Sequence, residues 1–166
     1  MKLRGRAHKY GADVNTDLIV PGWCLHTEDR RLWVPHCMED IDPDFVKRMK
    51  PGDFIVATTN FGCGSSREQA PIVIKESGIS AVIASSFARI FFRNAINIGL
   101  PILECQEASQ ATEMGDELEV NLVSGEIRNL TRRTTFCASP YPDFMRGIID
   151  RGGLIPYTKD RLKGGR

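Results

Sequence analysis

The residues best suited to chemistry lie at positions 60–68, in the order Asn-Phe-Gly-Cys-Gly-Ser-Ser-Arg-Glu. Two glycines let the backbone approach a ligand closely. Ser65 and Ser66 carry hydroxyls that can donate or accept hydrogen bonds, and the planar guanidinium of Arg67 suits a carboxylate or a phosphate. This segment therefore predicts a site that holds a negative charge beside a serine.

The segment lies between an expected strand and an expected helix. Residues 53–59 are apolar and β-branched, which predicts a strand. Residues 69–77 carry apolar side chains at helical spacing. A glycine-rich turn that leads into a helix presents unpaired backbone N–H groups, which favour an anion. The same residues also fit a capping box, in which Ser65 caps the helix and Glu68 bonds back to its N–H. Both interpretations remain open, although a cap does not need the preceding Gly-Cys-Gly.

The whole chain has the composition of one globular domain. Its 166 residues are 42% hydrophobic and 26% charged, and its formal net charge is +1, which are ordinary values for such a domain. The balanced charge indicates neither a nucleic-acid partner nor a membrane surface. No apolar run approaches the roughly 18 residues of a membrane helix, and the first residues lead into no signal-peptide core. We therefore expect a cytoplasmic protein.

The cysteines argue against a metal site within the chain. They are odd in number, five, and no two of them are spaced as C-x-x-C. This pattern predicts neither a disulfide framework nor a self-contained zinc or iron–sulfur site. We expect the chain itself to bind no metal. Cys63 lies within the glycine-rich segment, but a nucleophilic thiol there would need a histidine nearby in space.

The N-terminal third of the chain predicts short elements and one long loop. Residues 1–10 alternate loosely and predict an edge strand. Asn15 and its neighbours either cap a short helix or form an Asx turn. Residues 23–37 predict a long surface loop with some helix. A helix is expected from Pro43 to Lys50, with Asp42 as its cap.

Residues 53–105 predict strand, helix, strand, helix and strand, which is a βαβαβ unit with a parallel sheet. The glycine-rich segment then lies at the carboxyl edge of that sheet, where such folds bind ligands. Residues 118–130 predict a β-hairpin, and a last helix follows at 143–150. We expect one α/β domain over residues 1–158 and a flexible basic tail over residues 159–166.

Three stretches together resemble the small subunit, or swivel domain, of the aconitase-type hydro-lyases. They are Asp13–Asp17 with Ile19–Gly22, Asn60–Pro71 and Ser86–Pro101. The likeness runs from about residue 2 to residue 156 and is greatest to the isopropylmalate dehydratase and homoaconitase types. It implies a swivelling β/β/α-type domain, in which helices flank a small sheet with parallel strands and a C-terminal β-hairpin and helix follow.

The resemblance also implies an activity and roles for several residues. A large subunit with a [4Fe–4S] cluster would join this chain, and the pair would dehydrate and rehydrate a hydroxy dicarboxylic acid, foremost isopropylmalate in leucine biosynthesis. Ser65 matches the serine that removes the proton α to a carboxylate, Arg67 matches the arginine that grips a carboxylate, and Ser66 matches a neighbouring donor. Asp17 matches an acid that supports this hydrogen-bond network. Gly64 joins the substrate-binding set through its amide, and the isolated chain could form a homo-oligomer.

The specificity loop of the family corresponds to residues 22–28, where Leu25, His26 and Thr27 are the candidate substrate contacts. In the family that the chain resembles, isopropylmalate enzymes tend to carry an apolar residue at the position of His26, and homoaconitases tend to carry an arginine there. The substrate therefore stays open between isopropylmalate, the homoaconitase substrate and methylated malates such as citramalate or dimethylmalate. His26 could also simply point to solvent.

Two other functions remain open on the residues alone. Ser65 or Cys63 could act with His36 as a self-contained hydrolase, although Gly-Cys-Gly-Ser-Ser is not the G-x-S-x-G motif. The same loop could serve a non-enzymatic anion-binding module. Arg89 and Arg93 either face a large subunit or are solvated helix charges.

Overall fold

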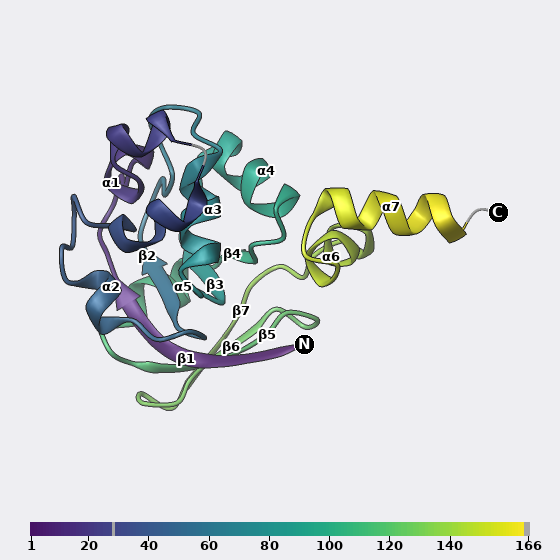
Figure 1. Ribbon diagram of the computed structural model, residues 1–166. Helices are drawn as coiled ribbons and strands as arrows, with labels where there is room; N and C mark the ends of the chain where they lie inside the picture. The colour runs from purple at the N-terminus through teal and green to yellow at the C-terminus, as the bar shows by residue number, and fades with distance from the viewer. Residues whose placement is uncertain (28, 165–166) are drawn as a thin grey trace.

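The computed structural model describes residues 1–27 and 29–164. A seven-stranded mixed sheet in the order β4-β3-β2-β1-β5-β6-β7 forms its centre, with helices packed around the parallel half (Figure 1). This arrangement confirms the predicted α/β class. The strands are β1 Lys2–Lys9, β2 Phe54–Ala57, β3 Ala81–Ala84, β4 Ile102–Glu104, β5 Glu117–Asn121, β6 Glu126–Asn129 and β7 Thr134–Cys137.

The helices fall into a group around the parallel strands and a C-terminal pair, α6 and α7, that extends to one side of the molecule (Figure 1). Three short 3-10 helices occupy the segment predicted as a long loop with some helix, which confirms that prediction. The α-helices are α1 Thr16–Ile19, α2 Phe45–Arg48, α3 Gln69–Glu76, α4 Arg89–Asn97, α5 Gln106–Ala111, α6 Asp143–Asp150 and α7 Leu154–Gly164, and the 3-10 helices are η1 Gly22–His26, η2 Arg30–Leu32 and η3 Val34–His36.

The parallel half of the sheet is the predicted βαβαβ unit. β2 pairs in parallel with β3, and β3 pairs in parallel with β4. Every residue of β2 and β3 is buried, as expected for parallel strands that are covered on both faces. The segments that follow β2 and β3 meet at the carboxyl edge, where Phe61 and Phe87 form an isolated parallel bridge. This edge positions the glycine-rich segment.

The first strand lies in the middle of the sheet, so the prediction of an edge strand over residues 1–10 is wrong. Its residues 2–6 pair antiparallel with β5, and its residues 7–9 pair in parallel with β2. The first half alternates between exposed and partly buried residues, which resembles an edge strand in sequence. Ala7 and His8 are buried where β1 enters the parallel half. One strand therefore joins a solvated half-sheet to a buried one.

The C-terminal third contains more regular structure than predicted. The expected hairpin is confirmed as β5 and β6, but β7 adds a third strand whose residues are mostly exposed. The predicted boundary at residue 159 falls inside α7, which continues to Gly164, so no break in secondary structure marks a tail there. Residues 165–166 lie outside the described residues. The division into a domain and a tail stays a prediction.

Helix α2 begins later than predicted, and Asp42 does not cap it. The Asp42 carboxylate accepts a hydrogen bond of 2.8 Å from Tyr10 Oη and pairs with Arg48. The helix starts at Phe45, and in the described part of the chain no side chain caps its first turn. Phe45 is fully buried and its ring contacts those of His8 and Tyr10 edge to face. Tertiary packing therefore sets the position of this turn.

Asp53 fastens β1 to the start of β2. Its nearly buried carboxylate accepts hydrogen bonds of 2.9 Å from the N–H groups of Arg6 and Lys50 and lies 2.9 Å from His8 Nε2. Burial favours the neutral form, but these hydrogen bonds outweigh burial and lower the pKa of Asp53 below its ordinary value. The hydrogen bonds of the folded state therefore stabilise the charged form of Asp53.

We expect Asp53→Asn to lower the free energy of unfolding by about 2–3 kcal/mol at neutral pH, because an amide cannot accept hydrogen bonds with both of its terminal atoms. Urea titration followed by circular dichroism measures this loss. The matched control is Asp44→Asn, which removes an exposed ion pair with Lys47 and should change stability by less than about 0.5 kcal/mol.

The parent chain and Asp53→Asn should also differ in how their free energy of unfolding depends on pH. A carboxyl group whose pKa is lowered in the folded state stabilises the fold fully above its unfolded pKa, and this stabilisation is lost as the pH falls through the folded value. The gap between the parent chain and Asp53→Asn should therefore shrink below about pH 4. A gap that persists unchanged under acid conditions would contradict this role of Asp53.

Candidate active site

The glycine-rich segment forms a turn between β2 and α3 that is held against the start of α1. The Gly62 N–H donates to the Val14 carbonyl at 2.8 Å, and the Thr16 N–H donates to the Cys63 carbonyl at 2.9 Å. Asn15 and Cys63 also form an isolated parallel bridge. The turn is therefore a fixed part of the carboxyl edge of the sheet.

Two glycines give this turn its shape. Gly62 has φ +77°, and a Cβ there would lie 2.2 Å from Cγ of Phe91. Gly64 has φ +86°, but a Cβ there would meet its nearest neighbour, Cβ of Asn15, at 3.4 Å. Both positions need the left-handed conformation that glycine adopts freely. Gly62 also needs the absence of a side chain.

The backbone of Ser65 is fixed from two sides, whereas its hydroxyl is unengaged. Thr16 Oγ1 donates to the Ser65 carbonyl at 2.8 Å, and the Arg67 N–H donates to the same oxygen at 2.8 Å. Among the described residues, none bonds the Ser65 hydroxyl or accepts a hydrogen bond from the N–H groups of Gly64, Ser65 and Ser66. Ser65 and Ser66 are both exposed. These donors and the hydroxyl are therefore available to a ligand.

The capping-box interpretation of Ser65 is wrong. Helix α3 begins at Gln69, Glu68 occupies the N-cap position, and no side chain of the described residues caps the first turn. Ser65 lies four residues before the helix, and its carbonyl accepts a hydrogen bond from Thr16 Oγ1. The spacing of Ser65 and Glu68 fits a capping box, but the backbone is not helical directly after Ser65.

Arg67 links the turn to α1 and to the segment that follows it. Its Nη1 donates to the Val20 carbonyl at 3.0 Å, and its Nη2 pairs with Asp17 Oδ1 at 2.6 Å. The Arg67 side chain is 16% exposed and that of Asp17 is 57% exposed. Asn15 positions Asp17 in turn, since its side chain accepts hydrogen bonds from the N–H groups of Asp17 and Leu18. The structure thus confirms that Asn15 caps a short helix and brings Asp17 to Arg67.

A cleft of about 670 Å³ opens beside Ser65, a volume within the range of small-molecule sites. The turn forms one wall, through Gly64, Ser65, Ser66 and Arg67. The first two turns of α4 supply further lining residues, which include Arg89, Ile90 and Arg93. Four of the predicted site residues therefore share one cavity.

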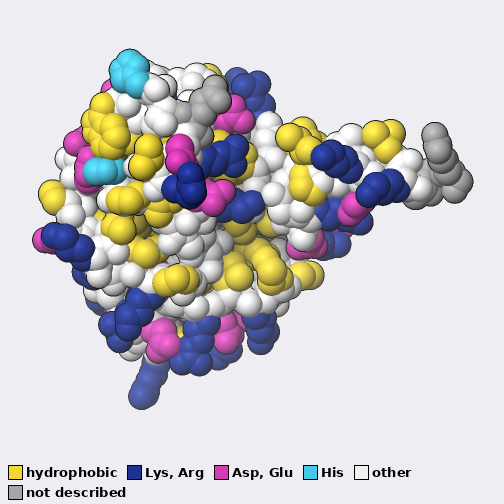
Figure 2. Space-filling model, in the orientation of Figure 1, with side chains coloured by type: hydrophobic (Ala, Val, Ile, Leu, Met, Phe, Trp, Pro, Cys, Tyr) yellow, Lys and Arg dark blue, Asp and Glu magenta, His cyan; other side chains and the backbone are white. Residues whose placement is uncertain are grey.

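The predicted specificity residues do not lie in this cleft. Leu25 and Thr27 line a separate pocket of about 420 Å³ together with Glu68 and Gln69. His26 is exposed and lines neither of the two cavities. Figure 2 shows hydrophobic side chains and two histidines gathered on the surface over the segment that carries η1–η3. Segment 64–69 lines both cavities, so the loop neighbours the cleft without entering it.

Sequence reasoning missed Thr16 and Asn94 and left the α4 arginines undecided. Thr16 is 2% exposed and lines the cleft. Asn94, Arg89 and Arg93 line the cleft, and the helical spacing of Arg89 and Arg93 was the signal that could have placed them on one face.

The described histidines and cysteines do not support a hydrolase. No histidine lines the cleft of Ser65 within the part of the chain that the structure describes. His36 pairs with Glu39 and contacts the ring of Trp23 edge to face. Burial, with a contribution from the negative charge of Asp13, raises the pKa of the Cys63 thiol, which makes a thiolate less available. The predicted pairing of Ser65 or Cys63 with His36 is not formed.

Over residues 1–27 and 29–164, no group of three or more His, Cys, Asp and Glu side chains could hold a metal ion. Across the same ranges, no helix has the length and apolar character that crossing a membrane requires.

Comparison with known proteins gives consistent matches over the whole fold. Residues 35–108 match the family model described as the aconitase C-terminal domain. The chain is 59% identical over 157 residues to the 3-isopropylmalate dehydratase small subunit of Endomicrobium trichonymphae, covering 95% of this chain and 96% of that one. It is 56% identical over 163 residues to that of Caldicellulosiruptor saccharolyticus, covering 98% and 94%.

A solved structure extends this likeness to three dimensions. The crystal structure of a 3-isopropylmalate dehydratase from Methanocaldococcus jannaschii superimposes with a TM-score of 0.93 at 48% identity, covering 98% of this chain and 96% of that chain. The fold and the sequence therefore agree on one family.

The two turn glycines give a test of the geometry. We expect Gly64→Ala to cost about 1–2 kcal/mol of folding free energy from backbone strain alone. Gly62→Ala should cost about 1–3 kcal/mol more, because its methyl group collides with Phe91. Urea denaturation of the two variants measures the difference, and equal losses would show that the Phe91 contact is not as tight as described.

Proposed function

Because the chain belongs to the family of 3-isopropylmalate dehydratase small subunits, we propose that it is the small subunit of a hydro-lyase that interconverts 2-isopropylmalate and 3-isopropylmalate. Its partner is a large subunit, and we infer that this partner carries a [4Fe–4S] cluster. The observation that supports the proposal most directly is the free Ser65 hydroxyl next to Arg67 in a cleft of about 670 Å³.

Ser65 is the proposed base. Dehydration removes a proton from the carbon next to one carboxylate and a hydroxyl from the neighbouring carbon, which leaves a double bond, and rehydration adds water in the opposite sense. An alcohol is a weak base, so its oxyanion needs preorganised donors. The N–H groups of Gly64 and Ser66 have no partner among the described residues and can supply them. The cluster of the partner would act as a Lewis acid toward the leaving hydroxyl.

Arg67 is the proposed carboxylate clamp. As the α-proton leaves, negative charge spreads onto the adjacent carboxylate, and a guanidinium stabilises that charge in the transition state. Asp17 and the Val20 carbonyl hold the guanidinium in one orientation, and its remaining N–H groups stay available. In this proposal Asp17 acts through Arg67 as a positioning residue.

The segment with Leu25, His26 and Thr27 is the proposed source of substrate preference. Leu25 and Thr27 line a pocket that shares segment 64–69 with the Ser65 cleft. His26 fits neither the apolar nor the arginine pattern of the family, so the homoaconitase substrate, citramalate and dimethylmalate are the alternative substrates for the same chemistry.

We expect Ser65→Ala to lower kcat about a thousand-fold in the complex reconstituted with the large subunit, because the proton acceptor is gone. Conversion of isopropylmalate measures the rate, and size-exclusion chromatography checks that the subunits still assemble. Ser139→Ala, an exposed serine outside the Ser65 cleft, is the matched control with normal kcat. A variant that keeps near-normal turnover would remove Ser65 from the mechanism.

Arg67→Lys should lower kcat/KM about a hundred-fold, because lysine keeps the charge but cannot hold Asp17, the Val20 carbonyl and a substrate carboxylate in one planar fork. Steady-state kinetics of the reconstituted complex measures this loss. Arg146→Lys changes an arginine in an exposed ion pair with Asp143 and should leave kcat/KM unchanged. If Arg67→Lys behaved like this control, the clamp would be refuted.

A further inference from the structure

Helix α4 contributes two more cations to the lining of the Ser65 cleft. Arg89 and Arg93 are exposed, line the cleft and lie four residues apart, so they project from one face of the helix. Within the described residues, neither guanidinium forms an ion pair or a hydrogen bond. Among the described residues, the cleft lining contains three arginines and no acidic side chain.

These positions are unfavourable for the helix itself. Arg89 is the first residue of α4, where the helix dipole disfavours a positive charge. Like charges four residues apart repel each other, and α4 contains no Asp or Glu that could offset them. An anion bound between the two guanidinium groups would relieve both effects.

Many other arginines of the described chain are paired with acids, although Arg6, Arg133 and Arg161 are not. These ion pairs are Arg4–Glu117, Arg31–Asp29, Arg48–Asp42, Arg128–Glu119, Arg132–Asp116, Arg146–Asp143 and Arg151–Asp160. The third cleft arginine, Arg67, also has its acid, Asp17.

We propose that Arg89 and Arg93 bind the second carboxylate of the dicarboxylic substrate, while Arg67 binds the carboxylate beside the carbon that loses its proton. This inference rests on the proposed function, because a substituted malate carries two carboxylates and Arg67 can hold one of them. Two guanidinium groups that share a carboxylate give charge-assisted hydrogen bonds from both sides. Ile90, which is 45% exposed, adds apolar surface to the same part of the cleft lining.

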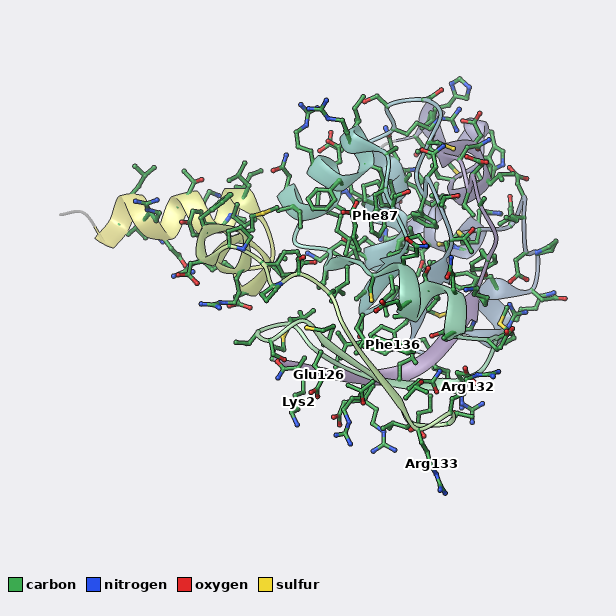
Figure 3. The ribbon with its side chains drawn as sticks, turned by 180° about the vertical axis from the view of Figure 1, so that it is seen from behind. Lys2, Phe87, Glu126, Arg132, Arg133 and Phe136 are labelled. Carbon is green, nitrogen blue, oxygen red and sulfur yellow. The ribbon has the colours of Figure 1, made fainter. Side chains whose placement is uncertain are left out.

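The test uses the complex reconstituted with the large subunit. Arg89→Gln and Arg93→Gln should each raise the KM for isopropylmalate about 10-fold, and the double substitution about 100-fold, with kcat within about threefold of the parent. Arg133→Gln is the charge-matched control. Arg133 stands at the tip of the β6–β7 turn, far from Phe87 near the start of α4 (Figure 3), and its substitution should leave KM within about twofold.

Subunit affinity decides between a substrate clamp and a docking surface. Titration of the small subunit with the large subunit should give the same dissociation constant for the parent and the double variant. An unchanged KM in the double variant would overturn the proposal. So would a weakened subunit affinity that accounts for the whole loss, with KM restored at saturating large subunit.

A binding measurement separates this proposal from the proposed function. Calorimetry with isopropylmalate as the probe should show binding to the parent complex and about 100-fold weaker binding to the double variant. If the parent complex bound the diacid through these arginines without converting it, the clamp would stand and the activity would be wrong. If both complexes bound it equally, the clamp would be wrong whatever the activity.

Discussion

The contact between the glycine turn and the start of α1 is the constraint on which the site depends. Thr16 of α1 donates a hydrogen bond to the Ser65 carbonyl of the turn. In the opposite direction, Arg67 of the turn pairs with Asp17 of α1. Each segment thus fixes the other, and the hydroxyl of Ser65 stays unbonded among the described residues. An alcohol that acts as a base requires this combination, since donors and backbone must be in place before the proton moves.

The parallel pairing of β1 with β2 is the reason why these two segments meet. β1 and β2 are parallel neighbours, so the residues that follow each strand leave the sheet at the same edge. The segment before α1 follows β1, and the glycine turn follows β2. Without this parallel pairing of β1 and β2, Asp17 and Arg67 would leave the sheet at separate places. The hydrogen bonds of Asp53 to Arg6 and Lys50 therefore support the site from the opposite end of the same strands.

The sequence predicts the features of the fold and site that depend on residues near each other in the chain. It does not predict the contacts between residues that are far apart in the chain. Apolar runs and glycine stops predict the unit from β2 to β4, and contiguity alone makes Ser65 and Arg67 neighbours in one turn. The Asp17–Arg67 pair requires strand order, which the alternating pattern of residues 1–10 does not carry. The capping box fails because α3 begins only at Gln69, four residues after Ser65. Leu25 and Thr27 line another pocket, since three 3-10 turns direct that loop beside the cleft.

The two kinds of arginine in the cleft suit two different stages of the proposed reaction. The carboxylate next to the departing proton gains negative charge in the transition state, so a guanidinium held rigidly by Asp17 stabilises that state more than the bound substrate. The distant carboxylate keeps the same charge throughout. Cations that bind it, such as Arg89 and Arg93, stabilise substrate and transition state equally and therefore act on KM rather than on kcat. The structure agrees with these two roles. Arg67 is held by an acid, whereas the α4 arginines have no partner among the described residues.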